Sequence, residues 1–316
     1  MAEGCNLHMT LSDVDKIEAA RNIEQKMEPG KISREMLQCA LKNNPKEFMR
    51  VLNDQKHPSY EKAKELLIKS LGEGKVSPLE QSRLPKALHS ILKNTSNPQG
   101  LFEKPPAHRG PGSTPTSHPY EALGAAALIQ KEVATSTGKT LKIHSTDRID
   151  FGQKAASNYT LSTRTKGTIE SDVLIQRENA FGVITESIGI DTKYSKRTTY
   201  STTNGLTRQL NGIRNSLNDG QLDEFHFVTN AQFSSRFKQM VNDTNTELIK
   251  DWVEKSGNSE FNNDIQKISG SKNEDTSISE MVDKLDYNNN RQKINQLTEK
   301  YDIPQIGFCE KVNYQD

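Results

Sequence analysis

Two aspartates and a lysine are the residues whose types and spacing best fit a chemical role. Asp172 stands near the start of one apolar stretch, and Asp191 and Lys193 lie near the end of another, 188–194. Alternate side chains of a strand share a face, so a strand here would point Asp191 and Lys193 together and Thr192 to the opposite face. Two converging carboxylates bind a hard cation such as Mg²⁺, and a nearby lysine stabilises charge on a phosphate. These residues are the minimum set for metal-assisted hydrolysis of a phosphodiester.

The size and composition of the chain limit the classes of fold and partner. Its 316 residues suggest about two domains. A net charge of +1 excludes a chain-wide surface for polyanions, so any nucleic-acid contact must come from a local basic patch. The apolar share of 32% is below the ~45–50% of average globular chains, which predicts a modest core.

Cysteine usage and apolar runs favour a reduced, cytoplasmic protein that does not contact a membrane. Cys5, Cys39 and Cys309 are scattered along the chain, which is typical of neither a disulfide framework nor a zinc module. Residues 1–10 lack the basic start and apolar run of a signal peptide. The longest apolar stretch, Ala122–Ile129, is far shorter than the ~20 residues of a membrane-spanning helix. Delivery into another cell by a specialised secretion system would leave no such signal, so that route stays open.

Helical signals dominate the first part of the chain. Over 1–95, apolar residues recur at helical spacing between short breaks, which predicts an all-α helical bundle. Residues 96–118 are rich in Pro and Gly and poor in apolar side chains, which predicts an extended linker. The remaining residues, 119–316, are predicted to form a second domain.

This second domain alternates helical and strand patterns, which predicts an α/β fold with a mixed central sheet flanked by helices. A polar loop is expected over 256–277. The helices are expected at 120–133, 203–218, 234–255 and 278–300, and the strands at 171–177, 182–194 and 222–229, with a final apolar stretch at 303–309.

The order of the polar residues resembles that of a known superfamily of nucleases. Glu121 on the first helix of the second domain, Asp172 on one strand and the Asp191-x-Lys193 pair on the next are similar to the PD-(D/E)xK nucleases. Members of that superfamily have the restriction-endonuclease-like fold, so the resemblance implies this fold for the second domain. The likeness covers 119–230, roughly a third of the chain.

The resemblance implies a role for each of these residues. Asp172, Asp191, Glu121 and the carbonyl of Thr192 would hold Mg²⁺ or Mn²⁺. Lys193 would position or activate the attacking water. The implied reaction is in-line hydrolysis of a phosphodiester that leaves a 5′-phosphate.

One further residue is implied, and two positions depart from the family pattern. A polar residue on the following helix would assist catalysis, and Gln209 is the best match for it. Ser171 replaces the proline that gives the motif its name. Asp191 stands where glutamate is more usual, although either carboxylate can bind a metal ion.

Nucleic acid is the implied substrate, with DNA expected before RNA. Basic side chains near the motif would grip the phosphate backbone, and such contacts weaken steeply as salt rises. The same charges are equally typical of solvated loops and helix surfaces. The residues expected to make the contacts are Lys196, Arg197, Arg208 and Arg164.

Two other interpretations remain open. Asp172 and Asp191 could lie at strand ends and pair at the surface with Lys193 or Arg197. The chain could also be a non-catalytic interaction protein, whose helical N-terminal domain binds a partner and whose nuclease-like domain is a degenerate scaffold. A helical module joined by a Pro/Gly linker to a nuclease domain is, in addition, the layout of bacterial toxins and effectors, for which a dedicated inhibitor protein is expected.

Overall fold

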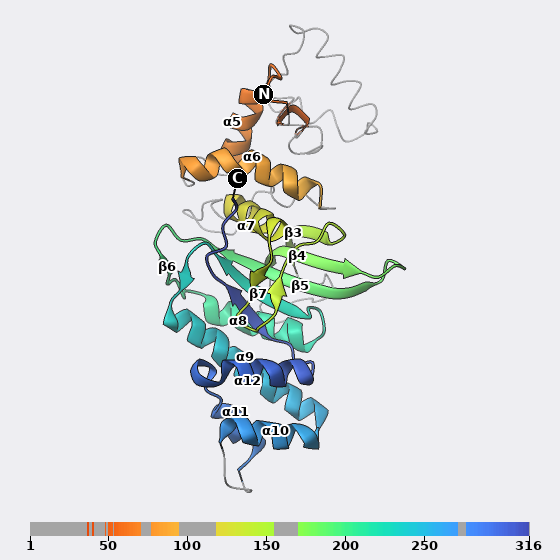
Figure 1. Cartoon of the computed structure of the whole chain (residues 1–316), viewed down its shortest axis with the longest axis vertical. Coiled ribbons are helices and arrows are strands. Elements are labelled where there is room, and N and C mark those ends of the chain that lie inside the picture. The colour runs from red at the N-terminus through yellow and green to blue at the C-terminus, as the bar shows by residue number, and fades with distance from the viewer. Residues whose placement is uncertain are drawn as a thin grey trace.

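A five-stranded mixed sheet with helices on both faces lies at the centre of the molecule (Figure 1). The computed structural model describes residues 37, 40, 48, 50–52, 54–70, 77–94, 118–154, 170–270 and 276–315. The helices are α5 (Tyr60–Ser70), α6 (Pro78–Leu92), α7 (His118–Gln130), α8 (Leu206–Asn218), α9 (Ser235–Ser256), α10 (Ser259–Ser269), α11 (Ile278–Asp283) and α12 (Tyr287–Lys300). The central strands are β3 (Arg148–Lys154), β4 (Glu170–Glu178), β5 (Ile184–Lys193), β7 (Glu224–Thr229) and β9 (Ile306–Cys309).

The central sheet has the strand order β3-β4-β5-β7-β9. The first three strands run antiparallel, whereas β7 runs parallel to β5 and β9 runs parallel to β7. This arrangement confirms the predicted α/β class with a mixed sheet flanked by helices. Short strands form two further pairs, β1 (Val133–Ala134) with β2 (Thr140–Leu141) and β6 (Thr199–Tyr200) with β8 (Gln232–Phe233).

Each face of the sheet is buried under its own helices because successive side chains of a strand point to opposite faces. Ile188 and Ile190 belong to a cluster that includes the buried alanines of α7. Phe225 and Phe227 belong to a second cluster, which includes α8 and α9. Figure 1 shows α7 on one side of the sheet and α8 and α9 on the other.

Of the predicted N-terminal bundle, the structure describes α5, α6 and a few residues before them. Ser77 caps α6 through a capping box with Glu80, and Pro78 occupies the first turn, where its missing N–H costs nothing. The α6 side chains Leu84, Leu88 and others share a buried cluster with α7. The other residues of the predicted bundle, and the linker predicted for 96–118 up to residue 117, lie outside the described residues.

The C-terminal helices differ from the prediction in two places. The polar loop expected over 256–277 contains the helix α10. Its buried side chains Phe261 and Ile265 form a short apolar stripe that packs the helix against its neighbours. The single helix expected over 278–300 is two helices, because Asp286 caps the start of α12 with two backbone N–H bonds. These helices pack on α9 through their own apolar cluster. None of the described helices is long and apolar enough to cross a membrane.

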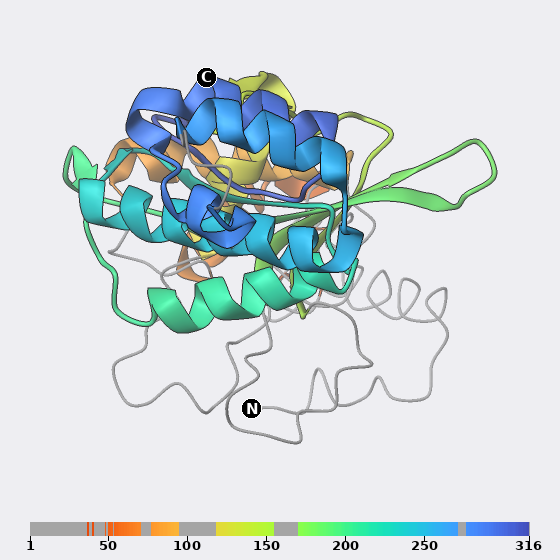
Figure 2. The same cartoon turned by 90° about the horizontal axis from the view of Figure 1, so that it is seen from below.

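A hairpin formed by β4 and β5 projects beyond the rest of the sheet (Figure 2). The side chain of Asn179 accepts hydrogen bonds from the backbone N–H groups of Phe181 and Val183, and Gly182 adopts a positive φ of 74°. These contacts place the turn at residues 179–183. The tip leaves Phe181 91% exposed.

Packing between β5 and β7 leads to a prediction about Gly189. A Cβ atom at this position would lie 2.6 Å from the ring of Phe225 and 2.9 Å from the hydroxyl of Ser171. Gly189→Ala is therefore expected to lower the free energy of unfolding by about 1–3 kcal/mol, as overpacked cores do. Urea denaturation measures this change. Val183→Ala, in the exposed turn of the β4–β5 hairpin, is the control and should shift stability by less than about 0.5 kcal/mol. Equal effects of both variants would contradict the packing described.

Candidate active site

The two aspartates face each other at the point where the β4–β5 ladder ends. The last paired residues towards this end are Val173 and Ile190, and Asp172 and Asp191 are the next residues of the two strands. Beyond this pair, the Asp172 carboxylate accepts hydrogen bonds from the adjacent strand β5. Its Oδ2 accepts hydrogen bonds from the backbone N–H of Thr192 at 2.7 Å and from the Thr192 hydroxyl at 2.9 Å. The sheet thus brings the two predicted carboxylates to one place.

Asp191 accepts hydrogen bonds from two other predicted residues, Lys193 and Gln209. The ammonium group of Lys193 donates to Asp191 Oδ2 at 2.6 Å, as expected for side chains two residues apart on one strand. The side-chain amide of Gln209, on α8, donates to the same oxygen. Lys193 also lies over the ring of Phe227, with its nitrogen 5.8 Å from the ring centre. These contacts hold a lysine, an amide and a carboxylate together at the end of β5.

Glu121 reaches this region from the opposite face of the sheet. It lies in the first turn of α7 and is only 4% exposed. The approach of α7 is close, because a Cβ atom on Gly124 would lie 3.0 Å from the Thr192 methyl group. The negative charge of Glu121 contributes to raising the pKa of Asp172.

Electrostatics at the site reflect an excess of buried negative charge. Burial, then the charge of Asp191, then that of Glu121, raise the pKa of the Asp172 carboxyl well above its usual value. Burial opposes the charged form of Lys193, but attraction to Asp191 and Asp172 outweighs it, so the pKa of Lys193 is raised. The ammonium group of Lys193 therefore lies between the charges of Asp191 and Asp172, and the two carboxyl groups crowd each other.

The donor types fit a hard divalent cation, although the oxygens are partly occupied. Carboxylate and carbonyl oxygens are the ligands that Mg²⁺ and Mn²⁺ prefer. Lys193 and Gln209 contact one oxygen of Asp191, and Thr192 contacts one oxygen of Asp172. Within the described ranges, no three or more His, Cys, Asp or Glu side chains form a group that could hold a metal ion.

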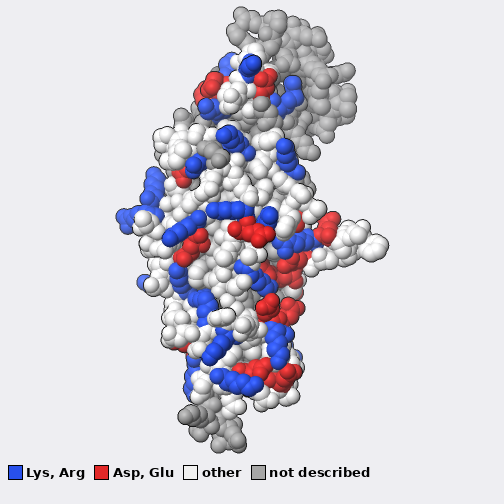
Figure 3. Space-filling view, viewed as in Figure 1, with Lys and Arg blue, Asp and Glu red and all other residues white. Residues whose placement is uncertain are grey.

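The residues predicted to contact nucleic acid lie at the surface, apart from one that falls outside the described residues. Lys196 and Arg197, in the segment after β5, and Arg208, on α8, are exposed. Arg164 lies outside the described residues. Figure 3 shows Lys and Arg side chains interspersed with Asp and Glu over the visible face, which agrees with the near-zero net charge. Arg214, also on α8, forms a bidentate salt bridge with Asp251.

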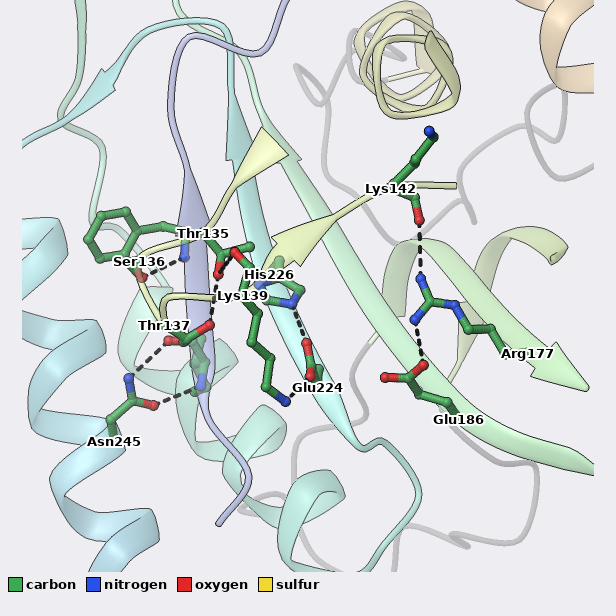
Figure 4. A network of polar contacts seen from close by, with 12 residues as sticks. Thr135, Ser136, Thr137, Lys139, Lys142, Arg177, Glu186, Glu224, His226 and Asn245 are labelled. Atoms are coloured by element: carbon green, nitrogen blue, oxygen red, sulfur yellow. Dashed lines mark hydrogen bonds and ion pairs between the residues drawn. The ribbon is translucent and has the colours of Figure 1, made fainter. Parts of the chain in front are cut away.

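A second polar network surrounds His226 on β7 (Figure 4). The side chain is 1% exposed, and its Nε2 lies 2.9 Å from a carboxylate oxygen of Glu224. Lys139 contacts the other oxygen of Glu224. Cys309, on the next strand, is buried, and burial raises the pKa of its thiol to about 12. A protonated, buried thiol is a poor nucleophile.

The sequence did not predict that α6, part of the expected helical bundle, would border the site on the side of α7. Tyr194 directly follows Lys193, and its hydroxyl donates to Glu80 of α6 at 3.1 Å. The ring of Tyr194 also stacks on Tyr120 of α7. The sequence offers no local signal for this contact, because Glu80 and Tyr194 are 114 residues apart.

Comparisons with models of known protein families, with curated proteins and with solved structures found no match.

The crowded carboxyl groups predict that removing the charge of Asp172 stabilises the fold. A raised pKa means that the folded state binds the proton more tightly than the unfolded chain does, so stability falls as pH rises above 3.8. Asp172→Asn keeps an oxygen that can accept from Thr192, and we expect it to raise the free energy of unfolding at pH 7 by about 1 kcal/mol. Thermal unfolding measures this gain, which should disappear below about pH 4.

The matched control is Asp223→Asn. Asp223 is exposed and also accepts a backbone N–H of β5, from Ser187 at 2.7 Å. It should show no comparable gain at pH 7. A loss of stability in Asp172→Asn would contradict the charge crowding described.

Glu224 should show the opposite pH dependence. Burial disfavours its charge, but the hydrogen bond and charge of His226, together with Lys139, lower the pKa of Glu224 from 4.5 to about 2. The stability that it contributes is therefore present above pH 4.5 and is lost as pH falls towards 2. Glu224→Gln should lower the free energy of unfolding by up to about 3 kcal/mol at pH 7. The difference in stability between this variant and the unaltered protein should shrink as pH falls from 4.5 towards 2. Urea denaturation at several pH values tests this, with the exposed Glu299→Gln as a control that should show no such gap.

Proposed function

We propose that the α/β part of this chain is a Mg²⁺- or Mn²⁺-dependent nuclease that hydrolyses phosphodiester bonds, with DNA as the first substrate and RNA as the second. One observation carries the proposal. Lys193 and Gln209 both donate to Asp191, and Asp172 lies across from it on the neighbouring strand. A surface pairing of strand-end charges does not explain this arrangement, because Asp191 is only 3% exposed.

The mixed sheet supports a restriction-endonuclease-like fold for this domain. The acidic residues lie on adjacent strands, β4 and β5, in the order that the resemblance requires. Helix α7 comes before these strands and contributes Glu121, and α8 comes after them and contributes Gln209.

Each site residue would have its own role in the reaction. Asp172, Asp191, Glu121 and the carbonyl of Thr192 would hold the cation, which polarises a phosphate and lowers the pKa of a bound water. Lys193 would stabilise the charge that develops on the phosphate, since its raised pKa keeps it protonated. Gln209 would orient Asp191. Lys196, Arg197 and Arg208 would contact the phosphate backbone on either side.

A non-catalytic role is the second candidate, and one observation favours it. Lys193, Gln209 and Thr192 already satisfy part of the carboxylate oxygens, and no three-acid group encloses a metal position in the described part of the chain. On this reading the domain would be a degenerate scaffold, and the helical N-terminal part would bind a protein partner.

The architecture suggests a biological setting for the nuclease. A helical segment that precedes such a domain is the layout of bacterial toxins and effectors, and on this analogy we extend the proposal to a toxin or effector with a dedicated inhibitor protein.

Substitutions at the site test the proposal directly. Asp191→Asn and Lys193→Met should each reduce Mg²⁺-dependent nicking of plasmid DNA, or cleavage of RNA, by about 10²–10⁴-fold while the protein stays folded. Gln209→Ala should cause a smaller loss, because it acts through Asp191. Gel assays with Mg²⁺, with Mn²⁺ and with a chelator measure this, and circular dichroism checks the fold.

The matched control is Lys267→Met, on the exposed surface of α10, where the side chain is 75% exposed. It should cleave like the unaltered protein. Cleavage that persists in a chelator, or that survives in Lys193→Met, would refute the assignment. If the unaltered protein cleaves neither DNA nor RNA with either metal, the non-catalytic candidate is favoured.

A further inference from the structure

Two stretches of the chain that contain no acidic residue lie side by side next to the proposed site. The chain as a whole carries 42 Lys and Arg against 41 Asp and Glu. No Asp or Glu, however, occurs between Asp191 and Asp219 or between Glu224 and Asp243. The pairing of β6 with β8 joins the two stretches. Figure 3 shows Lys and Arg side chains along the edge of the molecule where Figure 1 places β6, so a local basic surface exists on a nearly neutral chain.

We propose that residues 195–208 and 230–238 form a basic platform that holds the backbone of a double-stranded nucleic acid through four cations, without reading its bases and without a metal ion. The choice of nucleic acid as the partner rests on the proposed function. The double helix as its form, and the part played by Arg236 and α9, are additions to that function.

Hydrogen bonds on both sides of the β6–β8 pair hold the two stretches together. Before the pair, the backbone N–H of Ser195 donates to the side chain of Asn230 at 2.9 Å, and that side chain donates back to the Ser195 carbonyl at 2.9 Å. After the pair, the backbone N–H of Ser234 donates to the carbonyl of Tyr200 at 2.9 Å. Three cations flank this ordered strip in the sequence: Lys196, Arg197 and Arg236.

Arg208 joins the strip because α8 and α9 run side by side in the same direction. Arg214 pairs with Asp251, and further along both helices Lys255 donates to the carbonyl of Asn218 at 3.1 Å. The starts of the two helices therefore lie at the same end. Since α9 begins directly after β8, that end lies beside the β6–β8 pair. The first turns of both helices contain no acidic residue.

Four cations of the basic platform are free to contact phosphates. In the part of the chain that the structure describes, they are exposed and form no ion pair with a carboxylate: Lys196, Arg197, Arg208 and Arg236. Lys238 is not counted, because it pairs with Glu310 at 2.9 Å. Arg214 is not counted either, because it pairs with Asp251. Exposed Lys and Arg side chains of this kind contact phosphate oxygens, which position a nucleic acid without reading its sequence.

The basic platform offers no exposed ring on which an unpaired base could stack. Tyr200 is half-buried and lies edge-on to Phe233 and Phe237, with ring centres 5.9 Å apart in each case. Tyr194 stacks on Tyr120, and the other aromatic side chains of the two stretches are buried. Exposed aromatic rings are the usual means of holding single strands. A double helix instead offers one charge per ~1.7 Å of its axis, which suits contacts made by cations alone.

The basic platform adjoins the proposed site in the sequence at two points. Ser195 follows Lys193 by two residues, and Arg208 directly precedes Gln209. Because Gln209 donates to Asp191, a backbone held by Arg208 would pass close to the carboxyl groups.

The test measures binding by the full-length protein in a chelator, where no metal-dependent cleavage occurs. Fluorescence anisotropy compares a labelled DNA duplex, an RNA duplex and a DNA single strand of equal length over a range of salt concentrations. Four phosphate contacts predict a slope of log affinity against log salt of about −3.6 for the duplex, or about a 10²-fold loss between 50 and 200 mM salt. A duplex of either kind that behaves in this way supports the proposal, and the tighter of the two identifies the substrate.

Arg236→Gln and Lys196→Gln should each reduce the steepness of this slope by about 1 and weaken duplex binding about three- to tenfold at 50 mM salt. Thermal unfolding checks the fold. Arg236→Gln should lose no stability, because a cation in the first turn of a helix is opposed by the helix dipole.

Lys293→Gln is the matched control, because Lys293 is exposed on α12, away from β6 and β8. It should bind the duplex like the unaltered protein. The proposal is overturned if the duplex does not bind, if the single strand binds more tightly than the duplex, or if Arg236→Gln and Lys293→Gln behave alike.

These outcomes are separable from those of the nuclease assay. Duplex binding that depends on Arg236, without any metal-dependent cleavage, would keep the basic platform and remove the nuclease. Cleavage of duplex DNA that is unaffected by both Arg236→Gln and Lys196→Gln would keep the nuclease and remove the basic platform.

Discussion

The site depends on one hydrogen bond at the end of the β4–β5 ladder, in which a side chain accepts a backbone N–H group of the adjacent strand. The backbone N–H of Thr192 donates a hydrogen bond to the side-chain carboxylate of Asp172 on the neighbouring strand β4. This bond fixes Asp172 beside Asp191 inside the protein, where like charges repel strongly and the pKa of Asp172 rises. The fold therefore tolerates a local electrostatic cost at the place where the proposed site lies.

Both faces of the sheet contribute to this place because it lies at the end of β5. On one face, α7 packs closely enough against Thr192 to bring Glu121 into range of Asp172. On the other face, α8 presents Gln209 to Asp191 from within an apolar cluster that includes Leu206 and Leu210. Burial of these helices holds the polar groups with little freedom, and such rigidity is what a catalytic arrangement requires. Helix α6 borders the same region through the hydrogen bond from Tyr194 to Glu80.

The sequence allowed the central part of this arrangement to be predicted, because the two-residue period of a strand alone places Asp191 and Lys193 on one face. Gln209 and the sheet class followed from pattern and resemblance. Other features depend on contacts between distant segments, and no local pattern contains them. The stacking of Tyr194 on Tyr120 and its bond to Glu80 are of this kind. Helix α10 was missed because its few apolar residues lie in a polar stretch and become decisive only when they pack on α9.

The central claim is that the carboxyl groups of Asp172 and Asp191 converge to bind a divalent cation. Crystals grown or soaked with Mn²⁺ test this most directly, through the anomalous scattering of the metal. We predict one strong anomalous peak within bonding distance of both aspartates, with the Lys193 ammonium displaced from Asp191 or beside the peak. No peak at this place, with Lys193 and Gln209 still bound to Asp191 at high Mn²⁺ concentration, would contradict the account.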